Sequence, residues 1–226
     1  MISAACSEDH AIDTVVFDLG GVLIDWNPRH LYSKLITCEA AVERFLAEVC
    51  TAEWNHQLDA GRAFDEGIAE LIKKHPQEES LIRAWQDRWE EMLAGPIAGS
   101  VALLEMMHDR GLSLHAITNW SAETFPIARR RFKFLARFKT IVVSGEEGLA
   151  KPEAAIFDLL VNRTGAQPGR SIFIDDNPLN ITAAAALGFH TIHFTGPEAL
   201  REQLLDLRLI PSDQRALCGV QKSPGR

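Results

Sequence analysis

The stretch VVFDLGGVLIDWNP, residues 15–28, decides the fold because an apolar strand in it stops at a carboxylate. Residues 13–18 are predicted to form a buried strand, and Asp18 stands at its end. A glycine pair, Gly20 and Gly21, comes next and lets the backbone turn sharply and approach a ligand closely. An acidic side chain at the end of a core strand needs a chemical reason, which later parts of the chain supply.

Four later runs are short and rich in β-branched or aromatic residues, and they are predicted strands: 112–118, 140–144, 171–175 and 190–194. Helices are predicted around them, over 97–110, 122–135, 153–164, 178–187 and 197–207. Alternating strands and helices predict βαβ units, and therefore an α/β fold whose parallel sheet carries helices on both faces.

The segment 29–95 breaks this alternation. It is rich in Ala, Glu, Leu and Arg, shows helical spacing of its apolar residues and contains no convincing strand. We therefore predict an all-helical module inserted after the first strand, with hinges near Asp25–Pro28 and Gly95–Pro96. The predicted organisation is an N-terminal tail (1–12), a sheet domain (13–28 and 96–210), the helical module (29–95) and a C-terminal tail (211–226).

Composition narrows the possible partners. The chain of 226 residues is 46% hydrophobic, enough for a substantial core, and its net charge of -8 opposes binding to nucleic acid or to an anionic membrane. Its cysteines form no CxxC pair, and its first residues show no basic segment followed by a long apolar one. We therefore expect a cytoplasmic protein with a small-molecule substrate; the sequence leaves its oligomeric state open.

Polar side chains gather where the predicted strands end. Ligands of an open parallel sheet bind beyond the carboxyl ends of its strands. Those ends carry Asp18, then Thr118 with Asn119, then Asp175 with Asp176, and Lys151 precedes the helix that begins in KPEAAIF. The sequence therefore predicts one rim that holds carboxylates, a hydroxyl, an amide and an ammonium group.

This set of groups suits phosphoryl transfer. Asp18 can attack phosphorus and form an aspartyl phosphate, which divides one difficult step into two easier ones. Asp176 and Asp18 can hold Mg²⁺, with the backbone carbonyl of Gly20 as a further ligand, because this ion prefers oxygen ligands. Lys151 would neutralise the transferring group, and Thr118 would hydrogen-bond a phosphoryl oxygen.

Four segments, FDLGGVL, AITNWS, LAKPEAAIF and IFIDDNPLNITAAAALG, resemble in their order the signature motifs of the haloacid dehalogenase-like (HAD) hydrolases, over about residues 13–205. The helical insert resembles the C1 cap of subfamily IA. The resemblance implies a Rossmann-like core and, most often, a Mg²⁺-dependent phosphatase. It makes Asp18 the nucleophile, Thr118 and Lys151 phosphate-binding residues, and Asp176 a metal ligand. Asp175 is then a further or alternate ligand, and Asn180 stands where an acidic residue is more usual.

Gly20 departs from that family pattern. Most phosphatases of the family that this chain resembles have a D-x-D pattern, in which the second Asp protonates the leaving oxygen and then activates water. General acid and base help of this kind is worth about 10²–10⁴ in rate. Three replacements are open: Asp25 reaches the site, the substrate has a good leaving group, or a cap residue supplies the proton. Some relatives with a small residue here resemble sugar phosphatases, so a sugar phosphate is among the expected substrates.

Two other functions fit the same residues. A 2-haloacid dehalogenase also uses an Asp nucleophile but needs neither the acid nor Mg²⁺, and a binding or regulatory protein could retain the fold without catalysis. Adjacent Asp175 and Asp176 would repel an anionic substrate unless a cation lay between them. The sequence therefore favours the metal-dependent phosphatase.

The inserted module offers candidates for contact with substrate. The segment NHQLDAGRAFDE predicts a turn at Asp59–Gly61, which could hang over the site. His56 and Arg62 would then contact substrate, the alternative being that both are ordinary surface residues. The aromatic positions are assigned separately: Trp54, Trp85 and Trp89 are expected in the core of the module, and Trp120 either walls the pocket or packs under the module.

Overall fold

A parallel sheet of five strands forms the centre of the molecule, with the order β5-β4-β1-β6-β7. The structure, a computed structural model, describes residues 11–212, so the predicted tails lie almost wholly outside the described residues. The strands are β1 (Thr14–Phe17), β4 (Ser113–Thr118), β5 (Thr140–Val143), β6 (Ser171–Asp175) and β7 (His190–His193). All five predicted strands and the parallel α/β fold are thereby confirmed.

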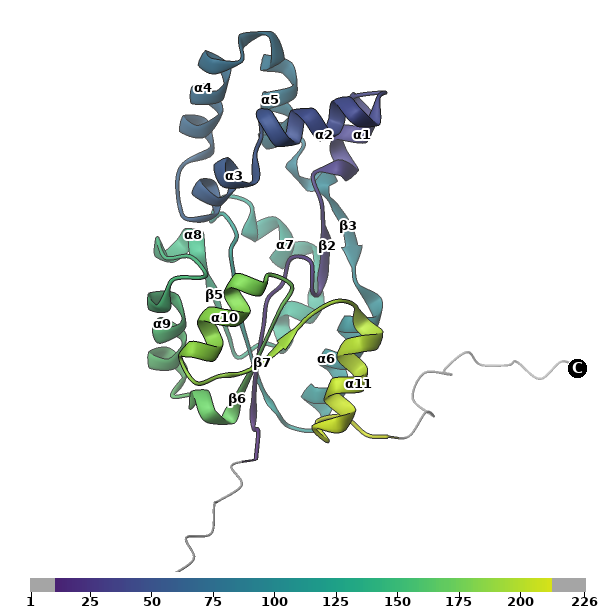
Figure 1. Cartoon of the computed structure of the whole chain (residues 1–226), viewed down its shortest axis with the longest axis vertical. Helices are drawn as coiled ribbons and strands as arrows, with labels where there is room; N and C mark the ends of the chain where they lie inside the picture. Colours follow the sequence, from purple (N-terminus) through teal and green to yellow (C-terminus); the bar gives the residue numbers. More distant parts are fainter. Residues whose placement is uncertain (1–10, 213–226) are drawn as a thin grey trace, which may run out of the picture.

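Helices cover both faces of this sheet (Figure 1). One face carries α6 (Ala98–Asp109), α7 (Phe125–Arg131) and α11 (Pro197–Asp206), and the other carries α9 (Ala154–Thr164) and α10 (Pro178–Ala186). Side chains of β1 alternate between the two layers, because Val15 and Phe17 join one apolar cluster and Val16 joins the other. Among residues 11–212, no helix combines the length and the apolar character needed to cross a membrane.

A second group of helices lies beyond the carboxyl ends of the strands, at the top of Figure 1. It comprises α1 (Arg29–Leu35), α2 (Glu39–Glu48), α3 (Ala52–Asp59), α4 (Phe64–Lys74) and α5 (Glu79–Asp87), and we call it the cap. Trp54 and Trp85 pack edge to face in its core with ring centroids 5.2 Å apart, as predicted. The cap therefore has apolar packing of its own above the sheet.

The chain enters and leaves the cap through a two-stranded antiparallel ribbon of β2 (Ile24–Trp26) and β3 (Leu93–Pro96). The sequence does not predict either strand, and the expectation that 29–95 contains no strand is wrong from Leu93 onward. Three or four residues are too few to show alternation, and Gly95 and Pro96 are disfavoured in strands. A ribbon of two strands has only edges, and that is where proline is tolerated.

Two helical segments also differ from the prediction. The helix predicted over 122–135 is the shorter α7, which ends at Arg131 and is followed by a 3₁₀ turn over Lys133–Arg137. Pro126 lies in its first turn, where a missing N–H leaves no hydrogen bond unmade. A four-residue helix, α8 (Ser144–Glu147), comes directly after β5 and ends at Gly148, whose positive φ of 65° suits glycine.

Candidate active site

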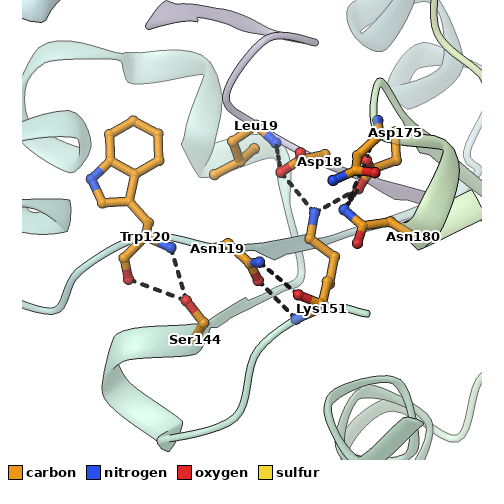
Figure 2. A network of polar contacts seen from close by, with 9 residues as sticks. Asp18, Leu19, Asn119, Trp120, Ser144, Lys151, Asp175 and Asn180 are labelled. Carbon is orange, nitrogen blue, oxygen red and sulfur yellow. Dashed lines mark hydrogen bonds and ion pairs between the residues drawn. The ribbon is translucent and has the colours of Figure 1, made fainter. Parts of the chain in front are cut away.

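Asp18 lies directly after the central strand β1 and is almost fully buried, with 9% of its surface exposed. Its backbone N–H donates to the carbonyl of Ile174 on β6 at 2.8 Å, which continues the strand pairing to the end of the sheet. Its Oδ1 atom accepts from the backbone N–H of Leu19 at 2.7 Å. The carboxylate is therefore held in place at the edge of the sheet, as Figure 2 shows.

Lys151 connects two carboxylates at this edge. Its Nζ atom lies 2.9 Å from Oδ1 of Asp18 and 2.7 Å from Oδ2 of Asp175, and only 1% of the side chain is exposed (Figure 2). Asn119 fixes the backbone of Lys151 by accepting from its N–H and donating to its carbonyl, each at 2.9 Å. Asn119 thus positions the lysine in addition to lining the site.

Asp175 ends β6 and is fully buried. The backbone N–H of Asn177 donates to its Oδ1 at 2.8 Å, and the amide of Asn180 on α10 donates to Oδ1 and Oδ2 at 3.0 and 3.1 Å. Both oxygens are therefore engaged, and Asn180 is an anchor for Asp175. Asp176, the next residue, is exposed on the side of the cavity.

Three acidic side chains and one lysine meet at this edge of the sheet. Oxygen atoms of Asp18, Asp175 and Asp176 lie within 4.8 Å of one another, and Lys151 is the cation bonded to two of them. Burial raises the pKa of Asp18 to about 7; Lys151 opposes the rise, and the charges of Asp175 and Asp176 add to it. Burial and the charge of Asp175 also raise the pKa of Asp176. Although burial opposes it, the carboxylates hold the pKa of Lys151 above its usual value.

A divalent cation such as Mg²⁺ fits this set of donors. Among residues 11–212, three carboxylates gather here around the ammonium group of Lys151, and the available ligands are hard oxygen atoms. The predicted ligand residues Asp18, Asp176 and Gly20 all line one cavity. Asp175 uses both of its oxygens in hydrogen bonds or the lysine contact, which suits it to orienting the neighbouring groups.

Two buried side-chain oxygens in this region have no hydrogen-bond partner among residues 11–212. They are Oγ1 of Thr118, at the end of β4, and Oδ1 of Asn180. Buried polar atoms are nearly always paired, so an unpaired one needs an explanation. The predicted role of Thr118, binding a phosphoryl oxygen, would supply the missing partner.

The two glycines after Asp18 have different constraints. Gly21 has a φ of +74°, and a Cβ atom there would lie 2.4 Å from Oδ2 of Asp176. A side chain at that position would strain the backbone and displace the carboxylate. No atom lies within 4 Å of the position that a Cβ of Gly20 would take. The structure therefore requires glycine at Gly21 and leaves open space beside Gly20.

Two cavities meet above the sheet edge. The larger has a volume of about 420 Å³ and holds Asp18, Lys151 and Asp176 in its wall. The smaller has a volume of about 60 Å³ and lies between the sheet domain and the cap. Both include Gly20, Trp26 and Asn119 in their linings, and the smaller one adds Asp59, Trp89 and Trp120.

The tryptophans of the smaller cavity come from three different parts of the chain. Trp89 and Trp120 are buried and pack together with ring centroids 5.6 Å apart. Trp120 therefore packs against the segment that leaves the cap and also walls a cavity, so both expectations for it hold. Trp89 differs from the expectation of a cap-core residue, because its ring lies at the boundary with the sheet domain.

Three of the predicted candidates line neither of these cavities. The carboxylate of Asp25 is 48% exposed and lies 2.9 Å from Nε2 of His30. His56 is exposed on α3, and the guanidinium group of Arg62 bonds to side chains on the neighbouring cap helices, Gln57 and Glu70. None of the three therefore lines a cavity that holds Asp18 or Gly20.

Asp59 lies in the turn that the sequence predicts near the site, but the sequence assigns it no role. It ends α3, its Oδ2 accepts from the amide of Asn55 at 2.8 Å, and its carbonyl accepts from the Ser144 hydroxyl at 2.5 Å. In the sequence, LDAG has the composition of a turn, and the chain does turn directly after Asp59. The signal that distinguishes this residue, a shared cavity with Gly20, depends on tertiary packing.

Solved structures resemble the fold as a whole. A HAD family enzyme from Bacteroides thetaiotaomicron, in complex with magnesium and inorganic phosphate, matches with a TM-score of 0.63 and 22% identity, over 82% of this chain and 95% of that one. The L-2-haloacid dehalogenase from Xanthobacter autotrophicus matches with a TM-score of 0.58 and 16% identity, over 88% of this chain and 85% of that one. At these identities, the likenesses show a common fold.

Proteins of known function are similar in sequence. Acyl-CoA dehydrogenase family member 10 of Mus musculus is 35% identical over 106 residues, which are 45% of this chain and 9% of that protein. The sesquiterpene phosphatase astK of Aspergillus oryzae is 26% identical over 193 residues, which are 85% of this chain and 94% of that protein. The chain thus spans a small part of the mouse protein and nearly all of the fungal one.

The family model of the haloacid dehalogenase-like hydrolases matches residues 12–188, which is more than half of the chain. The matched residues begin just before β1 and extend past α10, so they include Asp18, Lys151 and the paired acids at the end of β6. The resemblance drawn from the four sequence segments is thereby confirmed. This chain is a hydrolase and belongs to the haloacid dehalogenase-like family.

Proposed function

We propose that this chain is a Mg²⁺-dependent phosphatase that hydrolyses a small phosphomonoester through an aspartyl phosphate at Asp18. The observation that carries this proposal is the placement of Lys151, buried between Asp18 and Asp175, while Asp176 lies close to both acids. An anionic phosphoryl group and a divalent cation would each find oppositely charged partners there. The match to nearly all of the fungal sesquiterpene phosphatase supports phosphatase activity.

Each residue has a defined task in this reaction. The Asp18 carboxylate attacks phosphorus, Lys151 neutralises the transferring group, and the Thr118 hydroxyl donates to a phosphoryl oxygen. Mg²⁺, when bound, would be held by Asp18, Asp176 and the carbonyl of Gly20, and would add positive charge beside the phosphoryl group. Asn119 and Asn180 keep Lys151 and Asp175 in position.

The same arrangement disfavours a dehalogenase. A haloacid substrate carries a carboxylate, and three carboxylates at the sheet edge would repel it unless a cation were bound. A binding protein without catalysis is also disfavoured, because a site freed from catalytic selection has no need for a lysine buried between two acids. The phosphatase uses every one of these groups.

Phosphate release from a panel of phosphomonoesters tests the proposal. The panel would include sugar phosphates and p-nitrophenyl phosphate, assayed with Mg²⁺ and with a chelator, and Asp18→Asn would serve as the control. We expect turnover that requires Mg²⁺ and disappears in the variant. Halide release from 2-haloacids with no phosphate release would instead establish the dehalogenase.

A further inference from the structure

The open question in this site is the source of the proton for the leaving oxygen, because Gly20 has no side chain to provide it. We propose that Asp59 of the cap acts as the general acid and base, reaching across the space that the missing side chain of Gly20 leaves free. This inference rests on the proposed phosphatase function. It assigns to one cap residue both proton transfers that hydrolysis through Asp18 requires.

Geometry supports the assignment in two ways. Asp59 and Gly20 both line the smaller cavity, and Gly20 also lines the larger cavity that holds Asp18. No atom lies within 4 Å of the point where a Cβ of Gly20 would stand, so nothing fills the space beside that backbone. Asp59 therefore lines the same cavity as the position from which the acid of a D-x-D segment would project.

The surroundings of Asp59 fix its position. It is partly buried at the end of α3, where the Asn55 amide holds Oδ2 at 2.8 Å and the Ser144 hydroxyl holds the backbone carbonyl at 2.5 Å. Ser144 belongs to the sheet domain, so this contact also ties the cap residue to the edge that carries Asp18. The position of a proton donor has to be right before its pKa is relevant, and these two hydrogen bonds fix the position of Asp59.

The same surroundings favour the protonated form at neutral pH. Burial raises the pKa of Asp59 to about 8, and the negative charge of Asp18 adds to the rise. The backbone of Ser121 and the amide of Asn55 oppose it by hydrogen bonding. The other residues that line the smaller cavity are uncharged, and Asp18, which lines the adjoining larger one, is the charge that acts on the pKa of Asp59. Such a carboxyl can donate a proton near neutral pH.

Asp59 would transfer a proton in both chemical steps, the formation and the hydrolysis of the aspartyl phosphate. In the first, Asp18 forms a bond to phosphorus, the bond from phosphorus to the ester oxygen breaks, and the Asp59 proton passes to that oxygen, releasing the alcohol. In the second, the Asp59 carboxylate takes a proton from water as the water oxygen attacks phosphorus. The bond between phosphorus and Asp18 breaks, phosphate leaves, and both residues regain their starting forms.

Leaving groups of different basicity give the test, because a poor leaving group needs the proton and a good one does not. The quantity measured is kcat/KM, which reports the step that releases the alcohol, for phenyl phosphate and for p-nitrophenyl phosphate. In Asp59→Asn we expect a loss of about 10²-fold or more with phenyl phosphate and of less than about tenfold with p-nitrophenyl phosphate. The decline of the phenyl phosphate rate above about pH 8 should vanish.

Matched variants separate catalysis from structure. Asp59→Glu keeps an acid and should retain most of the phenyl phosphate activity, and Asp25→Asn, which alters an exposed acid paired with His30, should behave as the unchanged protein. Gly20→Asp in the Asp59→Asn background places an acid in the open space and should restore part of the lost rate. Thermal unfolding of each variant verifies that the cap is folded.

The outcomes distinguish the two levels of the proposal. Equal losses with both substrates, or no loss, would overturn the role of Asp59 and leave the phosphatase assignment standing. Turnover of neither substrate by the unchanged protein, together with no turnover across the wider panel, would overturn both. Retention of the alkaline decline in Asp59→Asn would also count against Asp59 as the proton donor.

Discussion

The two walls of the active site, the sheet edge and the cap, are built by different means. At the sheet edge, charged side chains are fixed at short distances by strand pairing and by one another, as Lys151 is by Asp18 and Asp175. The cap side contributes Asp59 and Trp89 to the smaller cavity and Arg29, the first residue of α1, to the larger one. One wall is positioned by the sheet topology, and the other is positioned by how the cap docks.

Specific polar contacts dock the cap on the sheet domain. The Glu123 carboxylate of the sheet domain accepts from the N–H of Phe64, the first residue of cap helix α4, at 2.9 Å. Arg131 donates to the carbonyl of Leu93 at 2.9 Å, at the exit of the ribbon. A Cβ added at Gly145 would lie 2.5 Å from the backbone N of Ala122, which shows how tightly the loops beneath the cap are packed. The difference between the walls is that the chemistry of the cap depends on such contacts.

Lys151→Met should have the largest effect, and it tests the sheet edge alone. It leaves Asp18 and Asp175 buried without their cation, which should cost about 3–5 kcal/mol in the free energy of unfolding and abolish turnover. The folded state then raises the pKa of these carboxyls above their unfolded values and binds more protons than the unfolded state. Stability relative to the unchanged protein must therefore fall as pH rises and recover as pH falls.

Urea unfolding with a chelator, at about pH 5 and about pH 8, measures that dependence. A stability deficit of the same size at both pH values would show that the two carboxylates are not the cause of the loss. It would also show that interactions between charged side chains do not hold the sheet edge together, and the two walls would then not differ in that respect.

Gly21→Ala should have the next largest effect, and Gly20→Ala is its matched control. The added methyl at Gly21 would lie 2.4 Å from Oδ2 of Asp176, so that carboxylate must move and Mg²⁺ affinity should fall by about 10–100-fold. Gly20 has open space at the corresponding point, and its variant should bind Mg²⁺ nearly as well as the unchanged protein. Calorimetric Mg²⁺ titration measures both; equal losses would contradict the distinction between the two glycines.

Glu123→Ala tests how the cap is held. It removes the acceptor for the N–H of Phe64, an interaction comparable to a helix N-cap and worth about 1 kcal/mol. We expect faster hydrogen exchange at the start of α4 and unchanged Mg²⁺ affinity, because the proposed metal ligands lie in the sheet domain. Unaltered exchange in α4 would mean that this contact does not secure the cap.

Asp25→Asn should have the smallest effect of all. The carboxylate is about half exposed and pairs with His30 at the surface, so its removal should change the free energy of unfolding by less than about 0.5 kcal/mol. The pH dependence of the rate should stay as it is. A changed pH profile would return the acid role to Asp25 and would weaken the claim that the cap supplies it.

The sheet edge could be predicted from the sequence to an extent that the cap could not. Asp18, Thr118 and Asp175 each stand at the carboxyl end of a strand, and neighbouring parallel strands bring such ends together. Their proximity results from local patterns and one topological rule. Asn180 is different, because nothing in its spacing distinguishes a helix residue of the first turn from an anchor for Asp175.

The cap resists prediction for a physical reason. The local pattern predicts the turn that begins at Asp59, but the environment of its carboxyl comes from Ser121, Trp120 and Ser144, which lie far away in the chain. Trp89 and Trp54 both lie in the helical segment and look alike in the sequence, yet Trp89 lines a cavity at the domain boundary. The ribbon of β2 and β3 is too short for periodicity to show.

The ribbon of β2 and β3 is also a point at which the cap could be removed or replaced. Trp26 of β2 pairs with Leu93 of β3, so the chain departs for the cap and returns from it at adjacent points. Residues 27–92 are therefore an excursion closed at its base, and a short hairpin turn joining the two strands would bypass it without cutting the central sheet. Recombination at this neck can exchange one cap for another while the residues at the sheet edge are left unchanged.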